Sequence, residues 1–476
     1  MTQGSPAAPL PEALSEVSTE STASIPVVQP AATQVAHEFS ARRRWREWHG
    51  WRDPQAWRRW LRPLGSGQGE IAALDGLRAL AALSVLVYHA LSIAGAHTVV
   101  AGHDLSWMHF YTESGVDLFF TLSGFLLFLP YARAMLDGRA LPKAREFYRR
   151  RALRILPAYY VCLAVLALAQ WKTYATPVGA QNILAHVVLL QDIAPAFNRT
   201  INGPFWTLAV EWQFYIILPL IAWAVARLSA GSPRRMLAGV LGVIAVALAL
   251  REVDALLAIQ RSALPASAAP WIDLLQRIVI GSQGKYLEVF GVGMLCGLIF
   301  TMLKRRPGAL TSRRARLAGL ALLGLALLVY LLFAPQVYER HNAILAAFYL
   351  ALRPTDVEMI AGPLVLGINY GALTLGVLLA PRLLRAPFEW YPLRFVGLIS
   401  YSLYLWHESI INLIYPHLYV SGSGSRVVAA LAIGVFVAIP FAYVSYQLVE
   451  RPFLRWRRAS GPRADARPAL VAAPAP

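Results

Sequence analysis

The stretch Leu74–Ala90, LDGLRALAALSVLVYHA, contains the features on which the predicted fold depends. It forms the middle of an apolar run, residues 72–94, that is long enough to cross the roughly 30 Å hydrocarbon core of a bilayer as an α-helix. Beyond Asp75 near its start, this apolar run contains the ionisable side chains Arg78 and His89. Eleven residues at 100° each bring both side chains onto the same helix face, about 16 Å apart along the axis. Ionisable side chains inside a membrane are functional candidates, so both residues are candidates for a site.

Nine further apolar runs have a similar length. Together with the first, the ten predicted spans cover residues 72–94, 114–134, 152–171, 205–228, 237–256, 285–303, 317–334, 360–381, 395–416 and 426–449. The chain of 476 residues is 57% hydrophobic and 15% charged, whereas soluble globular proteins contain about 25% charged residues. This composition excludes a soluble enzyme with a single membrane anchor. We expect an all-α polytopic membrane protein, a bundle of about ten transmembrane helices.

The distribution of basic residues predicts how these spans are oriented. Lys and Arg number 44 against 26 Asp and Glu, which gives a formal net charge of +18. With both termini in the cytoplasm, the inside segments hold about 34 basic residues and the outside segments about 9, as the positive-inside rule requires. We therefore expect a multi-pass protein of the bacterial cytoplasmic (inner) membrane with both termini cytoplasmic. Because the positive charge lies at helix ends, we expect no nucleic-acid partner.

The local amino-acid composition divides the chain into four predicted segments. Residues 1–40 are rich in Ala, Pro, Ser, Thr and Glu without periodicity and predict a disordered tail. Residues 41–69 interleave Arg with Trp, which is typical of a segment lying on an anionic membrane surface, with membrane lipids as partners; a nucleic-acid-binding arm is the weaker alternative. Residues 70–456 are the transmembrane domain, and 457–476 are a second disordered tail. No cleaved signal peptide is predicted, so the first span is expected to direct membrane insertion.

A carboxylate on the fourth span is the expected partner of His89. Glu211, in WTLAVEWQFYIILPL, is predicted to lie about six residues below the outer surface, and His89 about five residues below it on its own helix. A carboxylate bonded to one ring nitrogen would fix the tautomer and raise the basicity of the other nitrogen, as a general base requires. The alternative is that His89 and Glu211 only join two helices.

Arginines gather at the predicted inner face. Arg149, Arg150, Arg151 and Arg154 begin the third span, and a positive-inside anchor explains part of this run. Arg151 and Arg154, however, share a helix face, and Arg78 is expected at a comparable depth. Three converging guanidinium groups would bind phosphate through paired hydrogen bonds.

Three further polar residues are candidates for a supporting or substrate-binding role: Asp117, Ser123 and His407. Asp117 near the outer end of its span can equally cap a helix, and Ser123 beside Gly124 favours close helix packing over nucleophilic catalysis. His407 and its neighbour Glu408, in SYSLYLWHESI, are either members of an outer site or a polar helix contact. No set of residues with metal-ligand spacing is found, so no metal site is predicted.

In combination and in this order, several motifs resemble acyltransferase family 3, the bacterial membrane O-acyltransferases of surface glycans, lipids and secondary metabolites. The motifs are LDGLRALAALSVLVYHA, GVDLFFTLSGFLLF, RRALRILPAYY, WTLAVEWQFYIILPL, SYSLYLWHESI and VERPF, spread over about residues 70–456. The resemblance implies an acyl-CoA donor on the cytoplasmic side, commonly acetyl-CoA, and transfer to a hydroxyl group. It matches the family's Arg and His in the first helix to Arg78 and His89, its paired arginines to Arg151 and Arg154, and its acidic residue to Glu211.

This chain departs from the family pattern at two points. The family often has a second glutamate where this chain has Trp212, so no role for a second acid can be transferred. Family members often carry an extracytoplasmic hydrolase-like domain, and without one we expect this protein to act alone or with a partner.

The predicted mechanism places donor phosphates on Arg78, Arg151 and Arg154, and the thioester near His89. His89, oriented by Glu211, would then deprotonate the acceptor hydroxyl; Arg78 as oxyanion stabiliser and His89 as covalent acyl carrier stay open. The acceptor is a glycan, lipid or small-molecule hydroxyl, and a homo-oligomer is also left open. The alternative function is a proton-coupled transporter or flippase, and a non-catalytic scaffold is a second alternative.

Overall fold

The computed structural model describes residues 71–95, 98–105, 108–260, 269–279, 285–338 and 354–459. The chain divides into the units Met1–Pro63 and Leu64–Pro476, and every described residue belongs to the second unit. The predicted tail 1–40 and the Trp/Arg-rich segment 41–69 therefore lie outside the described residues. The predicted C-terminal tail begins too early, because residues 457–459 still belong to a helix; residues 460–476 lie outside the described residues.

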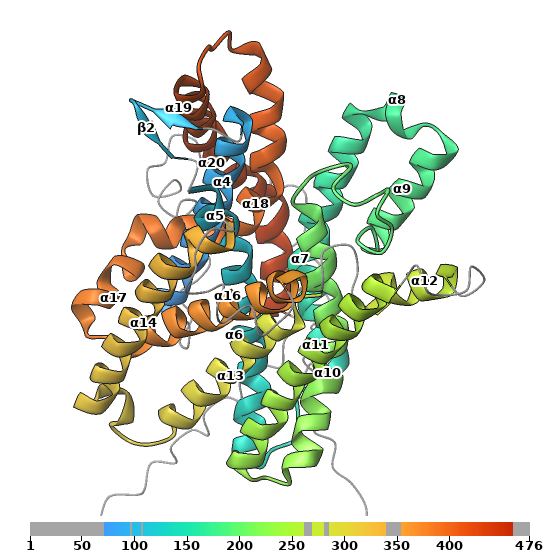
Figure 1. Cartoon of the computed structure of the whole chain (residues 1–476). Helices are drawn as coiled ribbons and strands as arrows, with labels where there is room; N and C mark the ends of the chain where they lie inside the picture. The colour runs from blue at the N-terminus through green and yellow to red at the C-terminus, as the bar shows by residue number, and fades with distance from the viewer. Residues whose placement is uncertain are drawn as a thin grey trace, which may run out of the picture. The chain divides into compact units, whose positions relative to one another are not determined.

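Almost all regular structure in the described residues is helical (Figure 1). The long helices are α4 (Ala72–Ala94), α6 (Gly115–Leu136), α7 (Ala144–Ala169), α10 (Phe205–Ser229), α11 (Pro233–Gln260), α13 (Leu287–Lys304), α14 (Arg313–Tyr338), α16 (Pro354–Leu379) and α18 (Tyr391–Ile414). The shorter helices are α5 (Met108–Glu113), α8 (Trp171–Tyr174), α9 (Pro177–Val187), α12 (Ala269–Val279), α17 (Arg382–Glu389), α19 (Ser423–Ile433), α20 (Ile439–Ser445) and α21 (Arg451–Ala459). Short 3-10 turns cover Ala309–Thr311 and Tyr415–His417, and π-helical turns at Gly434–Ala438 and Tyr446–Glu450 join α19, α20 and α21.

Within the described ranges, nine helical segments are long and apolar enough to cross a membrane. They include eight of the long helices and the continuous run Ser423–Trp456, so nine of the ten predicted spans coincide with them. The tenth predicted span, 395–416, lies in α18, a helix of 24 residues whose polar side chains lower its hydropathy. The prediction of an all-α polytopic membrane protein is confirmed, and the orientation of its termini stays a prediction.

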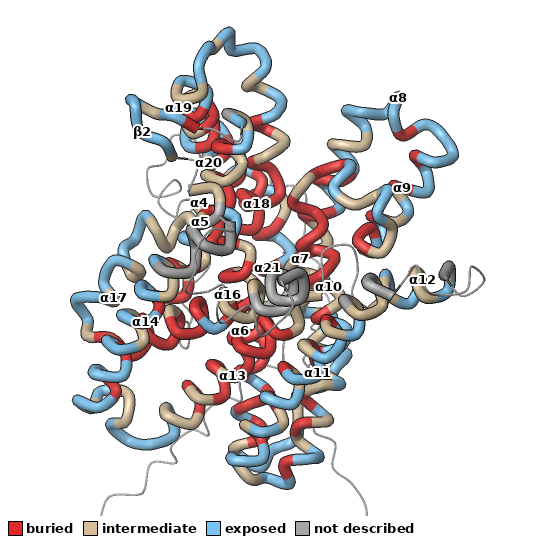
Figure 2. The backbone as a smooth tube through the Cα atoms, viewed as in Figure 1, coloured by how far each residue is buried: buried red, intermediate tan, exposed pale blue. Residues whose placement is uncertain are grey.

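Helices α6 and α13 form the centre of the described bundle, and Figure 2 shows buried backbone along both. In their most apolar stretches 72% of α6 and 67% of α13 is buried, against 17% of α14. The two central helices approach closely because they meet at glycines. A Cβ on Gly124 would overlap the carbonyl of Phe290, and one on Gly293 would overlap the carbonyl of Thr121. Peripheral helices instead expose large apolar side chains such as Leu168 and Leu220, as a lipid-facing surface requires.

The start of α6 lies beside the middle of α4 and not beside its end. A Cβ on Gly115, the first residue of α6, would lie 2.8 Å from the carbonyl oxygen of Ala81 and 2.9 Å from the Cβ of Ser84. These two residues lie near the centre of α4, so the last turns of α4 extend beyond α6. This axial offset decides which side chains can meet in the site.

A short hairpin that the sequence analysis did not predict follows α4. Strands β1 (Val99–Val100) and β2 (His103–Asp104) pair antiparallel, with Val99 opposite Asp104. The two turn residues, Ala101 at φ 49° and Gly102 at φ 82°, both have the positive φ of a tight hairpin turn. The Ser423 hydroxyl donates to the carbonyl of Val99 at 3.2 Å, which attaches the hairpin to α19.

Candidate active site

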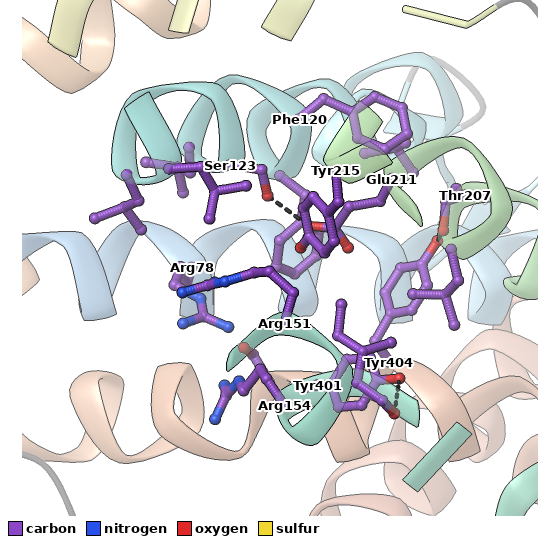
Figure 3. Close-up of a pocket in the computed structure, with 18 residues that line it drawn as sticks. Arg78, Phe120, Ser123, Arg151, Arg154, Thr207, Glu211, Tyr215, Tyr401 and Tyr404 are labelled. Atoms are coloured by element: carbon purple, nitrogen blue, oxygen red, sulfur yellow. Dashed lines mark hydrogen bonds between the residues drawn. The ribbon is translucent and has the colours of Figure 1, made fainter. Parts of the chain in front are cut away.

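One pocket lies between α4, α6, α7, α10 and α18, and Figure 3 shows the side chains that line it. Its polar lining residues are Arg78, Ser123, Arg151, Arg154, Thr207, Glu211, Tyr215, Ser400, Tyr401 and Tyr404. Apolar side chains such as Phe119, Leu126 and Ile155 complete the walls. Apolar walls with a few converging polar groups are typical of a small-molecule site.

The three arginines that the sequence analysis singled out line this pocket together. In Figure 3 the labelled side chains of Arg78, Arg151 and Arg154 gather at one end of the pocket, while Thr207 lies at the opposite end. Arg78 comes from α4, and the other two arginines come from successive turns of α7. The structure thus brings the predicted cationic group together; its role in binding a donor stays a prediction.

The contacts of these arginines leave capacity for an anionic ligand. The Nε–H of Arg151 is buried and has no hydrogen-bond partner among the described residues. Among the described residues, Arg154 has one acidic partner, with 3.6 Å between its Nη1 and Glu450 Oε2. A buried guanidinium donor without an acceptor is costly, and a phosphate would satisfy it with charge-assisted hydrogen bonds.

The predicted contact between Glu211 and His89 is wrong. Glu211 instead lines the arginine pocket, where its Oε1 accepts hydrogen bonds from Ser123 Oγ at 2.6 Å and from Tyr215 OH at 2.5 Å. No hydrogen bond or ion pair joins Glu211 to His89 in the described part of the chain, and His89 does not line the pocket. Glu211 is therefore a counter-charge of the arginines, and Ser123 is a polar link between α6 and α10.

The axial offset of α6 explains this error. The prediction assumed that all outward-facing helix ends lie at one depth. Because Gly115 lies level with Ala81–Ser84, Ser123, eight residues and about 12 Å further along α6, is level with the first turns of α4. Glu211 contacts Ser123, so it shares the level of Arg78, roughly 16 Å from that of His89.

His89 meets α18 instead, where His407 lies opposite it. His407 is buried, its Nδ1 lies 3.0 Å from the backbone oxygens of both Leu403 and Tyr404, and its Nε2 lies 3.1 Å from His89 Nδ1. Carbonyl oxygens only accept, so the proton of neutral His407 is on Nδ1 and its Nε2 accepts from His89. The Nδ1–H of His89 is also 2.8 Å from the carbonyl of Val85. The lone pair of neutral His89 is therefore on Nε2.

Glu408, which the sequence analysis left open as either an outer-site member or a polar helix contact, faces that Nε2 atom. Glu408 Oε2 is 3.8 Å from His89 Nε2, and the two side chains keep 22% and 18% of their surface exposed. A Cβ on Gly203 would overlap the Glu408 carboxylate, so the loop before α10 holds the carboxylate closely. This arrangement can accept a proton at Nε2 and stabilise the resulting imidazolium by the adjacent carboxylate.

Asp117 does not line the pocket, so the structure does not support its predicted role in the site. It is buried on α6 and interacts electrostatically with Arg251 of α11 and Glu288 of α13, which form an ion pair at 2.7 Å. His407, in contrast, does contact His89, although as a hydrogen-bond partner and not as a separate substrate group. No group of three or more His, Cys, Asp or Glu side chains that could hold a metal ion occurs in the described ranges.

Five polar pocket residues were missed by the sequence analysis: Thr207, Tyr215, Ser400, Tyr401 and Tyr404. Tyr215 was predictable, because it is four residues after Glu211 and so on the same helix face. Thr207 and Tyr404 belong to helices far apart in the chain and meet only through tertiary packing, with 2.7 Å between their hydroxyl oxygens. No local pattern could have paired them.

Comparison with known proteins identifies the family. The family model described as "Acyltransferase domain", of acyltransferase family 3, matches residues 71–446. The chain belongs to acyltransferase family 3. Its match includes every residue of the pocket and of the His89 site. The function class is therefore that of a membrane acyltransferase.

Curated relatives in acyltransferase family 3 are similar over most of this chain. A Bacillus subtilis (strain 168) protein, YrhL, named "Putative peptidoglycan O-acetyltransferase", is 26% identical over 80% of this chain and 54% of its own length. The Listeria monocytogenes protein OatA, named "Peptidoglycan O-acetyltransferase", is 24% identical over 80% of this chain and 55% of its own. This chain thus spans little more than half the length of these relatives. No solved structure matches it significantly.

Proposed function

We propose that this protein is an O-acetyltransferase of the bacterial cytoplasmic membrane that moves an acetyl group from acetyl-CoA to a hydroxyl of a cell-envelope glycan. The observation that supports this proposal most directly is the two-level arrangement on α4. Arg78 lines the cationic pocket, and His89, eleven residues further along, presents an open Nε2 beside Glu408. The acceptor class is suggested by the relatives that are named peptidoglycan O-acetyltransferases.

In this proposal the cationic pocket binds the phosphate groups of the donor. Arg78, Arg151 and Arg154 supply three positive charges to the pocket lining, in which Glu211 is the carboxylate; Glu450 pairs with Arg154 from outside the lining. The excess of positive charge attracts a polyanion, and guanidinium groups bind phosphate in a bidentate way. The positive-inside distribution of basic residues puts this end of the pocket toward the cytoplasm, where acyl-CoA is available.

The chemical step is assigned to His89. Its Nε2 takes the proton from the acceptor hydroxyl, and the resulting alkoxide oxygen attacks the thioester carbonyl carbon. Collapse of the tetrahedral intermediate breaks the C–S bond, and the leaving thiolate takes the proton back from His89. Glu408 stabilises the transient imidazolium, and His407 keeps the His89 Nδ1–H oriented as a donor. No proton is gained or lost overall, so the reaction needs no coupling to a proton gradient.

The test uses the full chain purified into lipid nanodiscs. Release of free CoA from acetyl-CoA and radiolabel transfer to isolated peptidoglycan glycan strands are measured together. We expect His89→Ala to lower transfer at least 100-fold, since general-base catalysis contributes typically 10²–10⁴-fold. The matched control is His103→Ala, an exposed histidine on β2. Near-normal transfer by His89→Ala would refute the mechanism.

The proposed donor site is tested separately, by a pocket variant and a matched control variant on the same helix. We expect Arg151→Ala to raise the KM for acetyl-CoA about tenfold through loss of one charge-assisted hydrogen bond, with the KM for the glycan unchanged. Arg145→Ala, an exposed arginine on the same helix outside the pocket, is the control. Equal KM values for the two variants would show that the pocket does not bind the donor.

A further inference from the structure

The end of the pocket that lies opposite the arginines is closed by two hydroxyl groups, those of Thr207 on α10 and Tyr404 on α18 (Figure 3). Both residues are buried, and the phenol oxygen of Tyr404 lies 2.7 Å from Thr207 Oγ1. The edge of the Tyr404 ring meets Phe119 with 5.6 Å between ring centroids, which fixes the orientation of the phenol.

The direction of this hydrogen bond follows from the other contact of Thr207. Thr207 Oγ1 donates its single hydrogen to the backbone oxygen of Pro204 at 2.9 Å. It therefore accepts from Tyr404, and the phenol O–H is a donor that lies at the pocket wall. A ligand oxygen in the pocket can replace Thr207 Oγ1 as the acceptor of the Tyr404 O–H. The exchange costs little free energy, because the phenol keeps one acceptor and Thr207 keeps its hydrogen bond to Pro204.

The same tyrosine is next to the histidine pair. The backbone oxygen of Tyr404 is 3.0 Å from His407 Nδ1, and the two rings are 5.9 Å apart. His407 in turn bonds to His89. Tyr404 therefore lies one helix turn before His407 on α18, close to the His89–His407 pair. Its hydroxyl is a hydrogen-bond donor at this end of the pocket, and the arginines lie at the other end.

We propose that the Tyr404 hydroxyl is the oxyanion donor of the reaction. The inference rests on the proposed function. With its phosphates on the arginines, the donor extends along the pocket so that its thioester carbonyl oxygen accepts the hydrogen bond from Tyr404. Attack by the acceptor oxygen converts this carbonyl into an oxyanion, which the phenol O–H stabilises. Collapse then re-forms the C=O bond and breaks the C–S bond, and the thiolate receives the proton from His89.

The test is Tyr404→Phe in the full chain in nanodiscs. The substitution removes only the hydroxyl and keeps the ring against Phe119 and the backbone oxygen at His407. We expect kcat for acetyl transfer to fall about 100-fold, the size typical of losing one oxyanion-hole donor, with the KM for acetyl-CoA unchanged. Tyr160→Phe is the matched control, because Tyr160 lies outside the pocket and its hydroxyl donates to the backbone oxygen of Val187 at 2.9 Å. It should keep the wild-type kcat.

Several results would overturn the assignment. A kcat within threefold of wild type for Tyr404→Phe, while His89→Ala is inactive, would reject the oxyanion role and leave the proposed function standing. Faster hydrolysis of acetyl-CoA without acceptor, at unchanged transfer, would show that Tyr404 only excludes water. Absence of transfer by the wild-type chain would reject both proposals.

A second measurement covers the case in which Tyr404→Phe does not fold. Site-specific 3-fluorotyrosine at position 404 keeps the shape of the side chain but makes its O–H more acidic. We expect a severalfold change in kcat and an additional high-pH limb in the rate profile. A kcat and a pH profile identical to wild type would contradict the proposal.

Discussion

At the scale of single residues, the site is organised by hydrogen-bond direction. His407 has two backbone acceptors at its Nδ1, so it can only accept at Nε2, and this leaves the His89 lone pair facing Glu408. A second histidine therefore does what the sequence analysis assigned to Glu211. The carboxylate of Glu211 instead reduces repulsion in the arginine pocket.

Gly203 provides a test of Glu408. A Cβ at this position would overlap the Glu408 carboxylate, and the backbone of Gly203 is outside the left-handed region, so alanine is otherwise tolerated. We expect Gly203→Ala to displace the carboxylate from His89 and to lower kcat about tenfold, which corresponds to about 1.4 kcal/mol. Initial rates of acetyl transfer at saturating acetyl-CoA measure the effect.

The control for this prediction is Gly242→Ala, because nothing lies within 4 Å of the Cβ built there. A double-mutant cycle with Glu408→Ala tests whether the effect of Gly203→Ala depends on the Glu408 carboxylate. If Gly203→Ala still lowers kcat tenfold in a Glu408→Ala background, its effect does not act through the carboxylate.

At the scale of helices, the axial offset between elements decides the chemistry. Helix α6 begins level with the middle of α4, and it is held against α13 by glycines on both helices. The π-helical turn Tyr446–Glu450 directs a buried carboxylate toward Arg154, and such turns often occur at functional sites. Packing at these contacts aligns Ser123 and Glu211 with the arginines.

The contact between α6 and α13 predicts a strong stability effect. Gly124→Ala would overlap the backbone of Phe290, and overpacking of this kind typically costs about 1–3 kcal/mol. We expect a lower thermal unfolding midpoint in detergent, followed by intrinsic fluorescence.

Gly324→Ala on α14 is the opposite case, since nothing lies within 4 Å of its Cβ. Alanine favours a helix over glycine by about 1 kcal/mol, so this variant should unfold at the same temperature or slightly higher. Equal destabilisation by both substitutions would show that α6 and α13 are not in close contact.

At the scale of the whole molecule, the proposed function requires two levels that open to opposite sides of the membrane. The positive-inside rule predicts that the arginine end faces the cytoplasm and that His89 lies toward the outside. A donor made in the cytoplasm can then react with an acceptor that never enters it. The described fold is consistent with this role, because most of its long helices meet the length and apolarity of membrane spans.

Cysteine labelling tests the orientation. Cys162 and Cys296 are free and buried, so neither should react with a membrane-impermeant maleimide. Ala196→Cys, exposed before α10, should be labelled in intact spheroplasts. Ala140→Cys, exposed between α6 and α7, should be labelled only after lysis. The reverse pattern would invert the orientation and place the arginine pocket on the wrong side for acyl-CoA.

Much of the fold and part of the site were predictable from sequence. Nine of the ten predicted spans coincide with described helical segments of membrane-spanning length and the tenth lies in α18, because the length of an apolar run is a local property set by bilayer thickness. The shared face of Arg78 and His89, and that of Arg151 and Arg154, follow from helical periodicity alone. These patterns were sufficient to name the arginines that line the pocket.

The pairing of side chains on different helices was decided only by the tertiary structure. Glu211 was assigned to the wrong partner because its depth depends on where α6 and α10 begin relative to α4, and that offset is set by contacts such as Gly115 against Ala81. His407 and Tyr404 reach the site from the distant α18. Sequence alone therefore determined which residues are in the membrane and which face of a helix they share, since both depend on local spacing. Which charges and hydroxyls meet depends on packing between helices, which only the folded chain provides.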